Sequence, residues 1–381
     1  MSTKRFFLLA TVAAFAVAAC TPSQSLAPSA PGITTLRTGR SAGLSVRLRT
    51  FTAGKTPGFL ASAVAWDIAA APDGAIWFTD PATPAVGRID ATGRVREFSR
   101  GLAQGSHPFS IVAAPDANMW FSDSGTGAIG RITPSGSITE FGQAKLAGDS
   151  GSGIVAGADD AIWAIELVPA SNGGFEPSAL ARVTTSGAVS TYRLPHLLAD
   201  GSLAVDASGD LWFLAIKGRS VVLGERSPDG SLISHRTGLV PGAEPCCPNL
   251  APKHLVIGRD GNPWFTTLYF ASNNPKYRPN SLATFASGHA TFYHLGGGHK
   301  LAFPVWPSGI ASDGTDLWVS GASVFEVKGA LFLVRGNGTH EVYGLDDDPI
   351  GMIWSKPAVW FTSQIDGVPS SIVQATVSVR H

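Results

Sequence analysis

Short apolar runs separated by turn residues recur along the chain, and the pattern is clearest in the phrase that begins at Trp66. Its four runs are Asp67–Ala71, Ala75–Thr79, Ala85–Ile89 and Arg94–Phe98. Pro-Asp-Gly stands between the first and second runs, and Ala-Thr-Gly between the third and fourth. Such turns supply the positive φ that a tight hairpin requires. The phrase therefore predicts four antiparallel strands, named a to d in chain order, that form one sheet.

This sequence repeat occurs again from Phe109. The tryptophan of run b marks each copy along the chain: Trp77, Trp120, Trp163, Trp212, Trp264, Trp318 and Trp360. The spacing ranges from 42 residues (Trp318 to Trp360) to 54 residues (Trp264 to Trp318). One blade cannot cover both faces of its own sheet, so neighbouring copies must stack. The pattern predicts an all-β fold, a seven-bladed β-propeller of four-stranded antiparallel blades. The seven tryptophans are expected to be core wedges between blades.

The last copy supplies only three of the four runs. It contains Trp360-Phe361 in run b and Ser371–Val379 in run c, and no run d follows. A matching run d lies at the other end of the chain, in Leu44–Phe51 (L-S-V-R-L-R-T-F). We therefore expect a propeller domain at 44–381 whose last blade is closed by an N-terminal strand.

Residues 1–20 have the layout of a secretory signal peptide. Lys4-Arg5 precedes an apolar stretch, Phe6–Val17, that is too short to span a membrane. The end of this segment, Val17-Ala18-Ala19-Cys20, resembles a bacterial lipobox, which implies cleavage before Cys20 and acylation of that cysteine. We expect a lipoprotein anchored in the bacterial cell envelope and facing the periplasm or exterior, because several acyl chains hold a protein stably at a membrane. The alternative is an ordinary signal peptide that contains a cysteine. Residues 21–43, rich in Pro, Ser, Ala and Gly, are typical of a flexible linker.

Charge and cysteine content narrow the classes of partner. The chain has 28 Lys and Arg against 28 Asp and Glu, and no basic stretch interleaves with aromatic residues. We therefore expect no nucleic-acid partner, and we expect a monomer. After Cys20, only Cys246 and Cys247 remain. In an oxidising compartment they can form a vicinal disulfide that stiffens their loop, or they stay as idle thiols; they lack the two-residue spacer of a thioredoxin-like motif.

Insertions fall in two classes of connection. The turns from a to b and from c to d stay short, whereas the b–c and d–a connections carry the additions Leu167–Ser178, Leu268–Asn280, Gly142–Ser152, Gly238–Lys253 and Leu295–Ser308. In an up-and-down blade both of these classes emerge at the same end. We call this end the loop-rich face, and we expect it to bind a small molecule or a protein, since variable loops on a rigid scaffold are where such folds place binding.

Two sets of residues are expected to line the central mouth on that face. The first set lies two positions before the first large apolar residue of run a: Trp66, Phe109, Ser152, Gly201, Lys253, Ser308 and Ile350. The second set lies three positions after the run-b tryptophan: Asp80, Asp123, Glu166, Ala215, Thr267, Gly321 and Ser363.

The repeat D-G-A-I-W-F-T-D, with G-R-I and R-E-F, resembles the virginiamycin B lyase (streptogramin lyase) family, whose blades read P-H-G-I, D-G-x-L-W-F-T-E, I-G-R-I and V-T-E-F. The resemblance covers residues 44–381 and is closest in the first three blades. It implies a seven-bladed ring. The members of this family that cleave streptogramin B antibiotics open a lactone by elimination. They use histidines and glutamates at the mouth together with Mg²⁺, and the resemblance implies the same chemistry where those residues are present.

The sequence departs from that family pattern at the positions that carry the chemistry. None of the seven P-H-G-I positions holds a histidine. His107 stands two residues too early in its blade, and His254 stands one residue after Lys253, which occupies the matching site. Glu166 keeps the family glutamate, whereas Asp80 and Asp123 are one methylene shorter. General acid–base catalysis needs a group within hydrogen-bonding reach of the proton, so we carry over the fold and not the lyase activity.

Each candidate site residue has two interpretations. Asp80, Asp123 and Glu166 either hold Mg²⁺ or Ca²⁺ through oxygen ligands or accept backbone N–H groups at the strand ends, which we favour. The catalytic candidates are His107, Asp123 and Glu166, and His107 is either a base near Asp123 or a solvated loop residue. A binding face would comprise Trp66, Asp80, Phe109, Lys253, His254, Tyr269, Tyr277 and Trp306, and loop packing is its alternative. The function hypotheses are accordingly a non-enzymatic ligand- or protein-binding lipoprotein, which we favour and for which no cofactor is expected, and a metal-assisted lyase or hydrolase acting on a small molecule.

Overall fold

The computed structural model describes residues 33–36, 44–142, 153–169, 175–218, 220–238, 254–267, 281–295, 305–323, 329–335, 340–345, 349–365 and 368–379. All of them lie within the unit Pro31–His381. The expected signal peptide, the lipidation of Cys20 and the pair Cys246 and Cys247 lie outside the described residues. The described segments contain no helix long and apolar enough to cross a bilayer.

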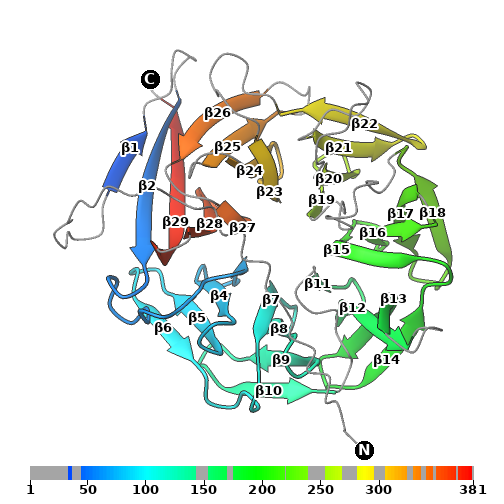
Figure 1. The fold of residues 1–381 in the computed structure, drawn as a ribbon, viewed down its shortest axis with the longest axis horizontal. Helices are drawn as coiled ribbons and strands as arrows, with labels where there is room; N and C mark the ends of the chain where they lie inside the picture. Colours follow the sequence, from blue (N-terminus) through cyan, green and yellow to red (C-terminus); the bar gives the residue numbers. More distant parts are fainter. Residues whose placement is uncertain are drawn as a thin grey trace, which may run out of the picture. The chain divides into compact units, whose positions relative to one another are not determined.

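Seven antiparallel sheets form the propeller, which confirms the predicted fold (Figure 1). Blade one comprises β3 (Ile68–Ala70), β4 (Ile76–Asp80), β5 (Ala85–Ile89) and β6 (Val95–Phe98), and blade two β7 (Pro108–Ala113), β8 (Met119–Asp123), β9 (Ala128–Ile132) and β10 (Ile138–Phe141). Blade three comprises β11 (Ile154–Ala156), β12 (Ala161–Pro169), β13 (Phe175–Thr184) and β14 (Val189–Arg193), and blade four β15 (Leu198–Val205), β16 (Leu211–Lys217), β17 (Ser220–Arg226) and β18 (Leu232–Arg236). Blade five comprises β19 (Leu255–Ile257), β20 (Pro263–Thr267), β21 (Ser281–Ala286) and β22 (His289–His294), and blade six β23 (Val305–Ser312), β24 (Leu317–Ser323), β25 (Gly329–Val334) and β26 (His340–Leu345).

The seventh blade joins the two ends of the propeller domain. It contains β27 (Pro349–Ser355), β28 (Ala358–Ile365), β29 (Val368–Val379) and β2 (Leu44–Thr52). β2 pairs with β29 along its full length, from Leu44 opposite Val379 to Thr52 opposite Ser371, which confirms closure by the N-terminal strand. A further strand, β1 (Ile33–Leu36), pairs with β2 as the outermost strand of this blade. It lies in the segment for which a linker was expected, and the sequence pattern does not reveal it.

The short turns have the predicted geometry. Gly74, between β3 and β4, has a φ of 80°, and Gly93, between β5 and β6, has a φ of 85°. In Figure 1 the strands β7, β11, β15, β19, β23 and β27 surround the centre, and β10, β14, β18, β22 and β26 form the rim. The observed strand order brings the b–c and d–a connections out at one end of each blade. In blade three the expected b–c insertion continues the sheet for part of its length, because Val168 pairs with Glu176 and Pro169 with Phe175.

The hydrophobic core of the propeller is divided among the interfaces between consecutive blades. The described residues form seven buried clusters, and each combines residues from two neighbouring blades. Trp77, which is 1% exposed, packs with Ile111 and Phe121 of the next blade. Burying a large apolar side chain stabilises the fold by about 1.5–3 kcal/mol. The tryptophans are therefore wedges between blades, as the sequence predicts.

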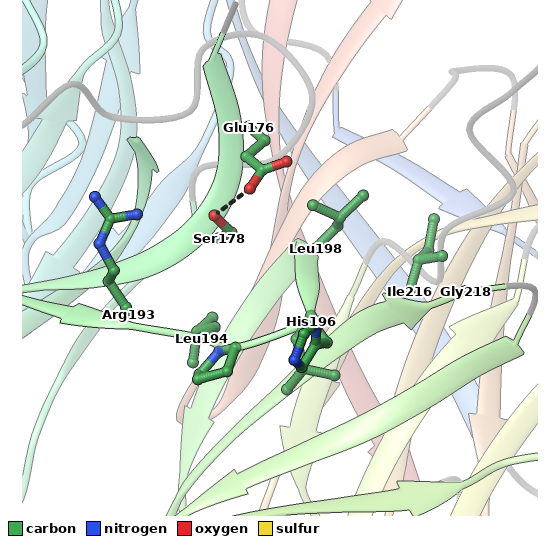
Figure 2. A pocket seen from close by; sticks show the side chains of 10 residues that line it. Glu176, Ser178, Arg193, Leu194, His196, Leu198, Ile216 and Gly218 are labelled. Atoms are coloured by element: carbon green, nitrogen blue, oxygen red, sulfur yellow. Dashed lines mark hydrogen bonds between the residues drawn. The ribbon is translucent and has the colours of Figure 1, made fainter. Parts of the chain in front are cut away.

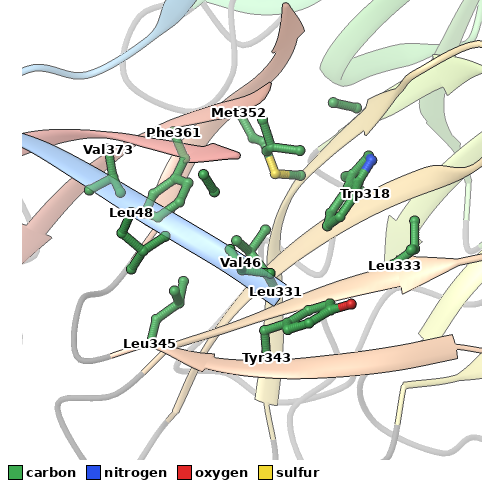
Figure 3. Packing of buried hydrophobic residues seen from close by; sticks show 13 residues of the cluster. Val46, Leu48, Trp318, Leu331, Leu333, Tyr343, Leu345, Met352, Phe361 and Val373 are labelled. Atoms are coloured by element: carbon green, nitrogen blue, oxygen red, sulfur yellow. The ribbon is translucent and has the colours of Figure 1, made fainter. Parts of the chain in front are cut away.

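β2 contributes to two of these interfaces, because alternate residues of a strand point to opposite faces. Val46 and Leu48 pack in the cluster between blades six and seven, which Figure 3 shows together with Trp318 of β24 and Phe361 of β28. Phe51 instead packs in the cluster between blades seven and one. The N-terminal strand thus stabilises both neighbours of the closing blade.

Hydrogen bonds fix several of the tryptophans to the turn that precedes them. The indole Nε1–H donates to the turn aspartate in Trp120–Asp116 at 3.2 Å, in Trp163–Asp159 at 3.1 Å and in Trp212–Asp206 at 2.9 Å. The same bond recurs in Trp264–Asp260 and Trp318–Asp313, each at 3.2 Å. A buried indole needs a hydrogen-bond acceptor, so these aspartates of the a–b turns are structural.

Candidate functional site

The innermost strands bulge where they reach the mouth. In β7 the register shifts between Pro108 and Ile111, which leaves Phe109 and Ser110 in a bulge. Similar shifts occur in β15, β23 and β27. A bulge adds a residue to one strand and re-aims its side chains. Mouth positions expected from the sequence lie inside these bulges: Phe109, Gly201, Ser308 and Ile350.

Trp66 and Phe109 form an aromatic pair at the mouth. Their ring centroids are 5.0 Å apart and their planes are inclined by 40°. Thr362 Oγ1 donates a hydrogen bond to the Trp66 carbonyl oxygen at 2.7 Å, and Thr79 Oγ1 donates to the Phe109 carbonyl oxygen at 2.6 Å. Each of these hydroxyl groups belongs to the preceding blade. At two positions where the lyase pattern has histidine, this chain therefore has a packed aromatic pair with a fixed backbone.

Asp80, at the end of β4, is fully buried. Its Oδ1 accepts hydrogen bonds from the backbone N–H groups of Val64 at 3.0 Å, Ala82 at 3.0 Å and Thr83 at 3.1 Å. The Thr83 hydroxyl donates to its Oδ2. The carboxylate thus organises the two chain segments around it, which confirms the expectation that it accepts loop amides.

Asp123, at the end of β8, has the same role in blade two. It is fully buried, and its Oδ1 accepts from the backbone N–H groups of His107 at 2.7 Å and Gly125 at 2.9 Å. Its Oδ2 accepts from the hydroxyl of Ser106. His107 therefore meets Asp123 through its backbone amide, and its side chain is exposed. The arrangement supports the interpretation of His107 as a solvated loop residue.

A glutamate of the fourth strand lies near each of these two aspartates. These glutamates are the central residues of the sequence patterns R-E-F and T-E-F, but the sequence analysis did not predict their position beside the aspartates. Ser106 Oγ lies 3.5 Å from Glu140 Oε1. Desolvation, together with the charge of Asp123, raises the pKa of Glu140. In blade one, desolvation together with the charge of Asp80 raises the pKa of Glu97 in the same way. Blades one and two therefore each contain a partly desolvated pair of carboxyl groups.

Glu166, at the family glutamate position on β12, differs from Asp80 and Asp123. It is 8% exposed, and its buried Oε2 has no hydrogen-bond partner among the residues that the structure describes. Within the same described residues, no three His, Cys, Asp or Glu side chains gather into a group that could hold a metal ion. The three carboxylates considered as ligands of Mg²⁺ or Ca²⁺ are thus not brought together.

The other predicted binding residues are only partly described. His254 precedes β19, and its carbonyl oxygen accepts a hydrogen bond from the Thr266 backbone at 3.0 Å. Trp306 lies on β23 and pairs through its backbone with Ala322. The remaining predicted binding residues, Lys253, Tyr269 and Tyr277, lie outside the described residues.

Asp67, directly before β3, is a mouth residue that the sequence analysis missed. Its Oδ1 accepts from the backbone N–H of Ile68 at 2.9 Å, and its Oδ2 accepts from that of Ile111, in the next blade, at 3.0 Å. Desolvation raises the pKa of Asp67 to about 6. The only sequence signal for this role is that an acidic residue directly follows the predicted mouth residue Trp66. Its role becomes apparent only when two blades are placed together.

Solved structures share this architecture. A selenomethionine-substituted virginiamycin B lyase from Staphylococcus aureus aligns over 87% of this chain and 99% of its own, with 18% identity and a TM-score of 0.65. A streptogramin B lyase structure aligns over 87% and 98%, with 20% identity and a TM-score of 0.66. YCF48, in a structure with a D1 peptide bound, aligns over 90% and 99%, with 11% identity and a TM-score of 0.54. At these identities the likeness establishes the fold.

A match to a family model shows which family the chain belongs to. No relative among curated proteins is similar enough to count as a match. The model of the virginiamycin B lyase family, in contrast, matches residues 50–274, which is more than half of the chain. The matched range includes the first four blades and the mouth residues Trp66, Phe109 and Glu166. The chain therefore belongs to the virginiamycin B lyase family.

Proposed function

We propose that this protein is a binding module of the virginiamycin B lyase family, and that its loop-rich face takes up a small molecule or a protein without chemical conversion. The hydrogen bonding of Asp80 and Asp123 carries this proposal. Both carboxylates are buried and accept several donors from their own loops. A general base must be free to reach the proton that it abstracts, and neither group meets that requirement.

The construction of the loop-rich face supports a binding role. The b–c and d–a connections rise from a rigid ring, and loops on a rigid scaffold are a common place for recognition. The fold is also compatible with polypeptide ligands, since the structurally similar YCF48 is bound to a D1 peptide in its structure. We further propose that Cys20 carries a lipid anchor that holds a monomeric protein at the bacterial envelope. Substitution Cys20→Ala should then release the protein from the membrane fraction, and its persistence there would refute the anchor.

One observation favours the alternative of a metal-assisted lyase or hydrolase. Glu166 keeps the family glutamate, and its Oε2 is buried without a hydrogen-bond partner in the described part of the chain. A metal ion or a substrate proton would satisfy such an oxygen. The alternative requires further ligands beside it, and the described residues do not supply a group of three.

A ligand screen tests the binding role. The purified protein is screened by thermal shift against peptides and small metabolites, and hydrogen–deuterium exchange then locates each hit. We expect protection at d–a connections such as 101–107, and none at c–d turns such as 90–94 and 133–137. Protection confined to those c–d turns, or chemical conversion of the bound compound detected by mass spectrometry, would overturn the proposal.

A further inference from the structure

A cavity of about 570 Å³ lies between blades three and four (Figure 2), and none of its lining residues is one of those expected at the central mouth. It is lined by residues of β13 to β16, of the connection from β14 to β15, and of the turn after β16: Glu176, Ser178, Arg193, Leu194, Pro195, His196, Leu197, Leu198, Ile216 and Gly218. The sides come from the b–c hairpins of both blades and the d–a connection between them. The cavity therefore opens on the loop-rich face.

Groups of opposite charge lie on its walls. Glu176 Oε1 accepts a hydrogen bond from Ser178 Oγ at 2.9 Å, which Figure 2 shows, and this bond orients the carboxylate. Arg193, at the end of β14, and His196 are exposed. In the described segments, neither of these two side chains forms a hydrogen bond or an ion pair with the protein. An exposed guanidinium and an exposed imidazole thus line the same cavity as a carboxylate that has a fixed orientation.

A tight turn holds His196 at the rim. Leu197 donates its backbone N–H to the Leu194 carbonyl oxygen at 3.1 Å, and both leucine side chains are 2% exposed. Pro195 and His196 are the central residues of the turn, and His196 has a φ of 62°. Glycine is the usual residue at such a position. Ala117, Asp160 and Ser287 also have positive φ, in short hairpin turns, so this backbone conformation follows from the tight turn.

The remaining wall is apolar. Leu198 is 38% exposed, and Ile216 of β16 is only half-buried. Figure 2 shows both on the blade-four side, opposite Arg193 of blade three. Cavities of 300 to 1,000 Å³ that combine apolar walls with a few polar groups are typical of small-ligand sites. A volume of about 570 Å³ falls within this range.

We infer that this cavity binds a short apolar peptide with free ends. The peptide carboxylate lies against Arg193 and His196, its ammonium group lies against Glu176, and an apolar side chain packs on Leu198 and Ile216. Charge-assisted hydrogen bonds to both ends supply the specificity. An inorganic anion would leave the apolar wall unused, and a fatty acid would place its chain beside Glu176. The inference rests on the proposed binding function, and it names the ligand class and one site for it.

Titration calorimetry with leucylleucine tests the site on the purified full-length protein. We expect binding of leucylleucine, and binding about tenfold weaker for both N-acetyl-leucylleucine and leucylleucinamide, since one charged hydrogen-bonded contact is removed from each. Arg193→Gln should weaken leucylleucine about tenfold and leave leucylleucinamide unchanged. Glu176→Gln should weaken leucylleucine about tenfold and leave N-acetyl-leucylleucine, which has no ammonium group, unchanged. The Gln side chain keeps its orientation because its oxygen still accepts the hydrogen bond from Ser178. Arg236→Gln, an exposed arginine on β18, is the matched control and should bind as the unsubstituted protein does.

Three outcomes overturn the inference. They are no heat of binding at millimolar leucylleucine, equal affinity for the blocked peptides, and an effect of Arg236→Gln as large as that of Arg193→Gln. An unchanged melting temperature of each variant shows that the fold is intact. If leucylleucine fails but another ligand protects the loop-rich face, this site is wrong and the proposed function stands. If leucylleucine is recovered cleaved, the proposed binding function itself is wrong.

Discussion

Phe51 of the N-terminal strand stacks on Trp360 of the last blade, with ring centroids 5.8 Å apart and planes 21° from parallel. The same pair recurs inside single blades, as Trp77 with Phe98 at 5.9 Å and Trp120 with Phe141 at 5.3 Å. Phe51 therefore occupies the position of a run-d aromatic residue that the C-terminal end of the chain lacks. Two residues separated by most of the sequence complete one blade and close the ring.

Replacing Phe51 should destabilise the whole ring. Phe51 is 2% exposed, and Phe51→Ala removes its contacts in the cluster between blades seven and one. We expect a loss of about 3–5 kcal/mol, the usual cost of truncating a buried phenylalanine. Denaturant unfolding followed by tryptophan fluorescence measures it. Phe292→Ala, at a side chain that is 42% exposed, is the matched control and should cost less than about 0.5 kcal/mol; equal losses in the two variants would contradict the closure account.

The hydroxyl groups that link consecutive blades should also contribute to stability. Thr79 Oγ1 accepts from the Asp67 backbone N–H at 3.1 Å and donates to the Phe109 carbonyl oxygen. Thr79→Val keeps the shape of the side chain but removes the partner of the partly buried Asp67 N–H and of the buried Phe109 carbonyl oxygen, so we expect a loss of about 1–3 kcal/mol. Thr139→Val, on the exposed side of β10, should change the melting temperature little. A Thr79→Val protein as stable as its control would show that these links are dispensable.

The pH dependence of stability should carry a signature of Asp67. Its folded-state pKa is raised to about 6 from an ordinary value of 3.8, so the fold favours the protonated form. The stability that this group contributes is present below the unfolded pKa and is lost as the pH rises through about 6. Asp67→Asn removes the titrating carboxyl group and replaces one of its two acceptor oxygens. We expect its melting temperature to lie below that of the unsubstituted protein at about pH 4 and the gap to narrow by about pH 7; a gap that widens would contradict the sign.

His107 and Asp123 should behave differently on substitution. His107 contributes its backbone amide to Asp123, which any residue except proline retains. His107→Ala should therefore leave the melting temperature unchanged. Asp123→Asn keeps one acceptor oxygen for the backbone N–H groups but replaces the other carboxylate oxygen with an NH2 donor, so one of the hydrogen bonds to Asp123 is lost, and we expect a loss of about 1–3 kcal/mol. If His107→Ala alone abolished ligand binding or any turnover, the histidine side chain would have a role that its exposed position does not indicate.

Much of the fold follows from local sequence signals. The run-b tryptophans and the turn glycines mark each blade, and the match between Leu44–Phe51 and a run d predicts the closing strand. These features are readable because strand alternation and turn chemistry depend on neighbouring residues. The strand β1 has no such signal, since an outermost strand needs no apolar face. Its pairing depends on β2 being in place.

The site was less predictable because it is built between blades. The bulge at Phe109 and the bridge from Asp67 to Ile111 require two sheets at a defined distance, and strand periodicity does not encode either. Sequence reasoning correctly favoured Asp80 and Asp123 as acceptors of loop amides. It did not anticipate the cavity lined by Arg193, because the blade-three insertion Leu167–Ser178, which supplies Glu176 and Ser178 to that cavity, was expected to be a loop.

The absence of lyase chemistry at the mouth is the central claim, and an assay with a streptogramin B antibiotic tests it most directly. The purified protein is incubated with the antibiotic and excess Mg²⁺, and the linear product of lactone opening is followed by mass spectrometry. We predict that the lactone stays intact at the rate of the buffer control. Accumulation of the opened product that depends on the protein, and that disappears in the Glu166→Gln variant, would contradict the account.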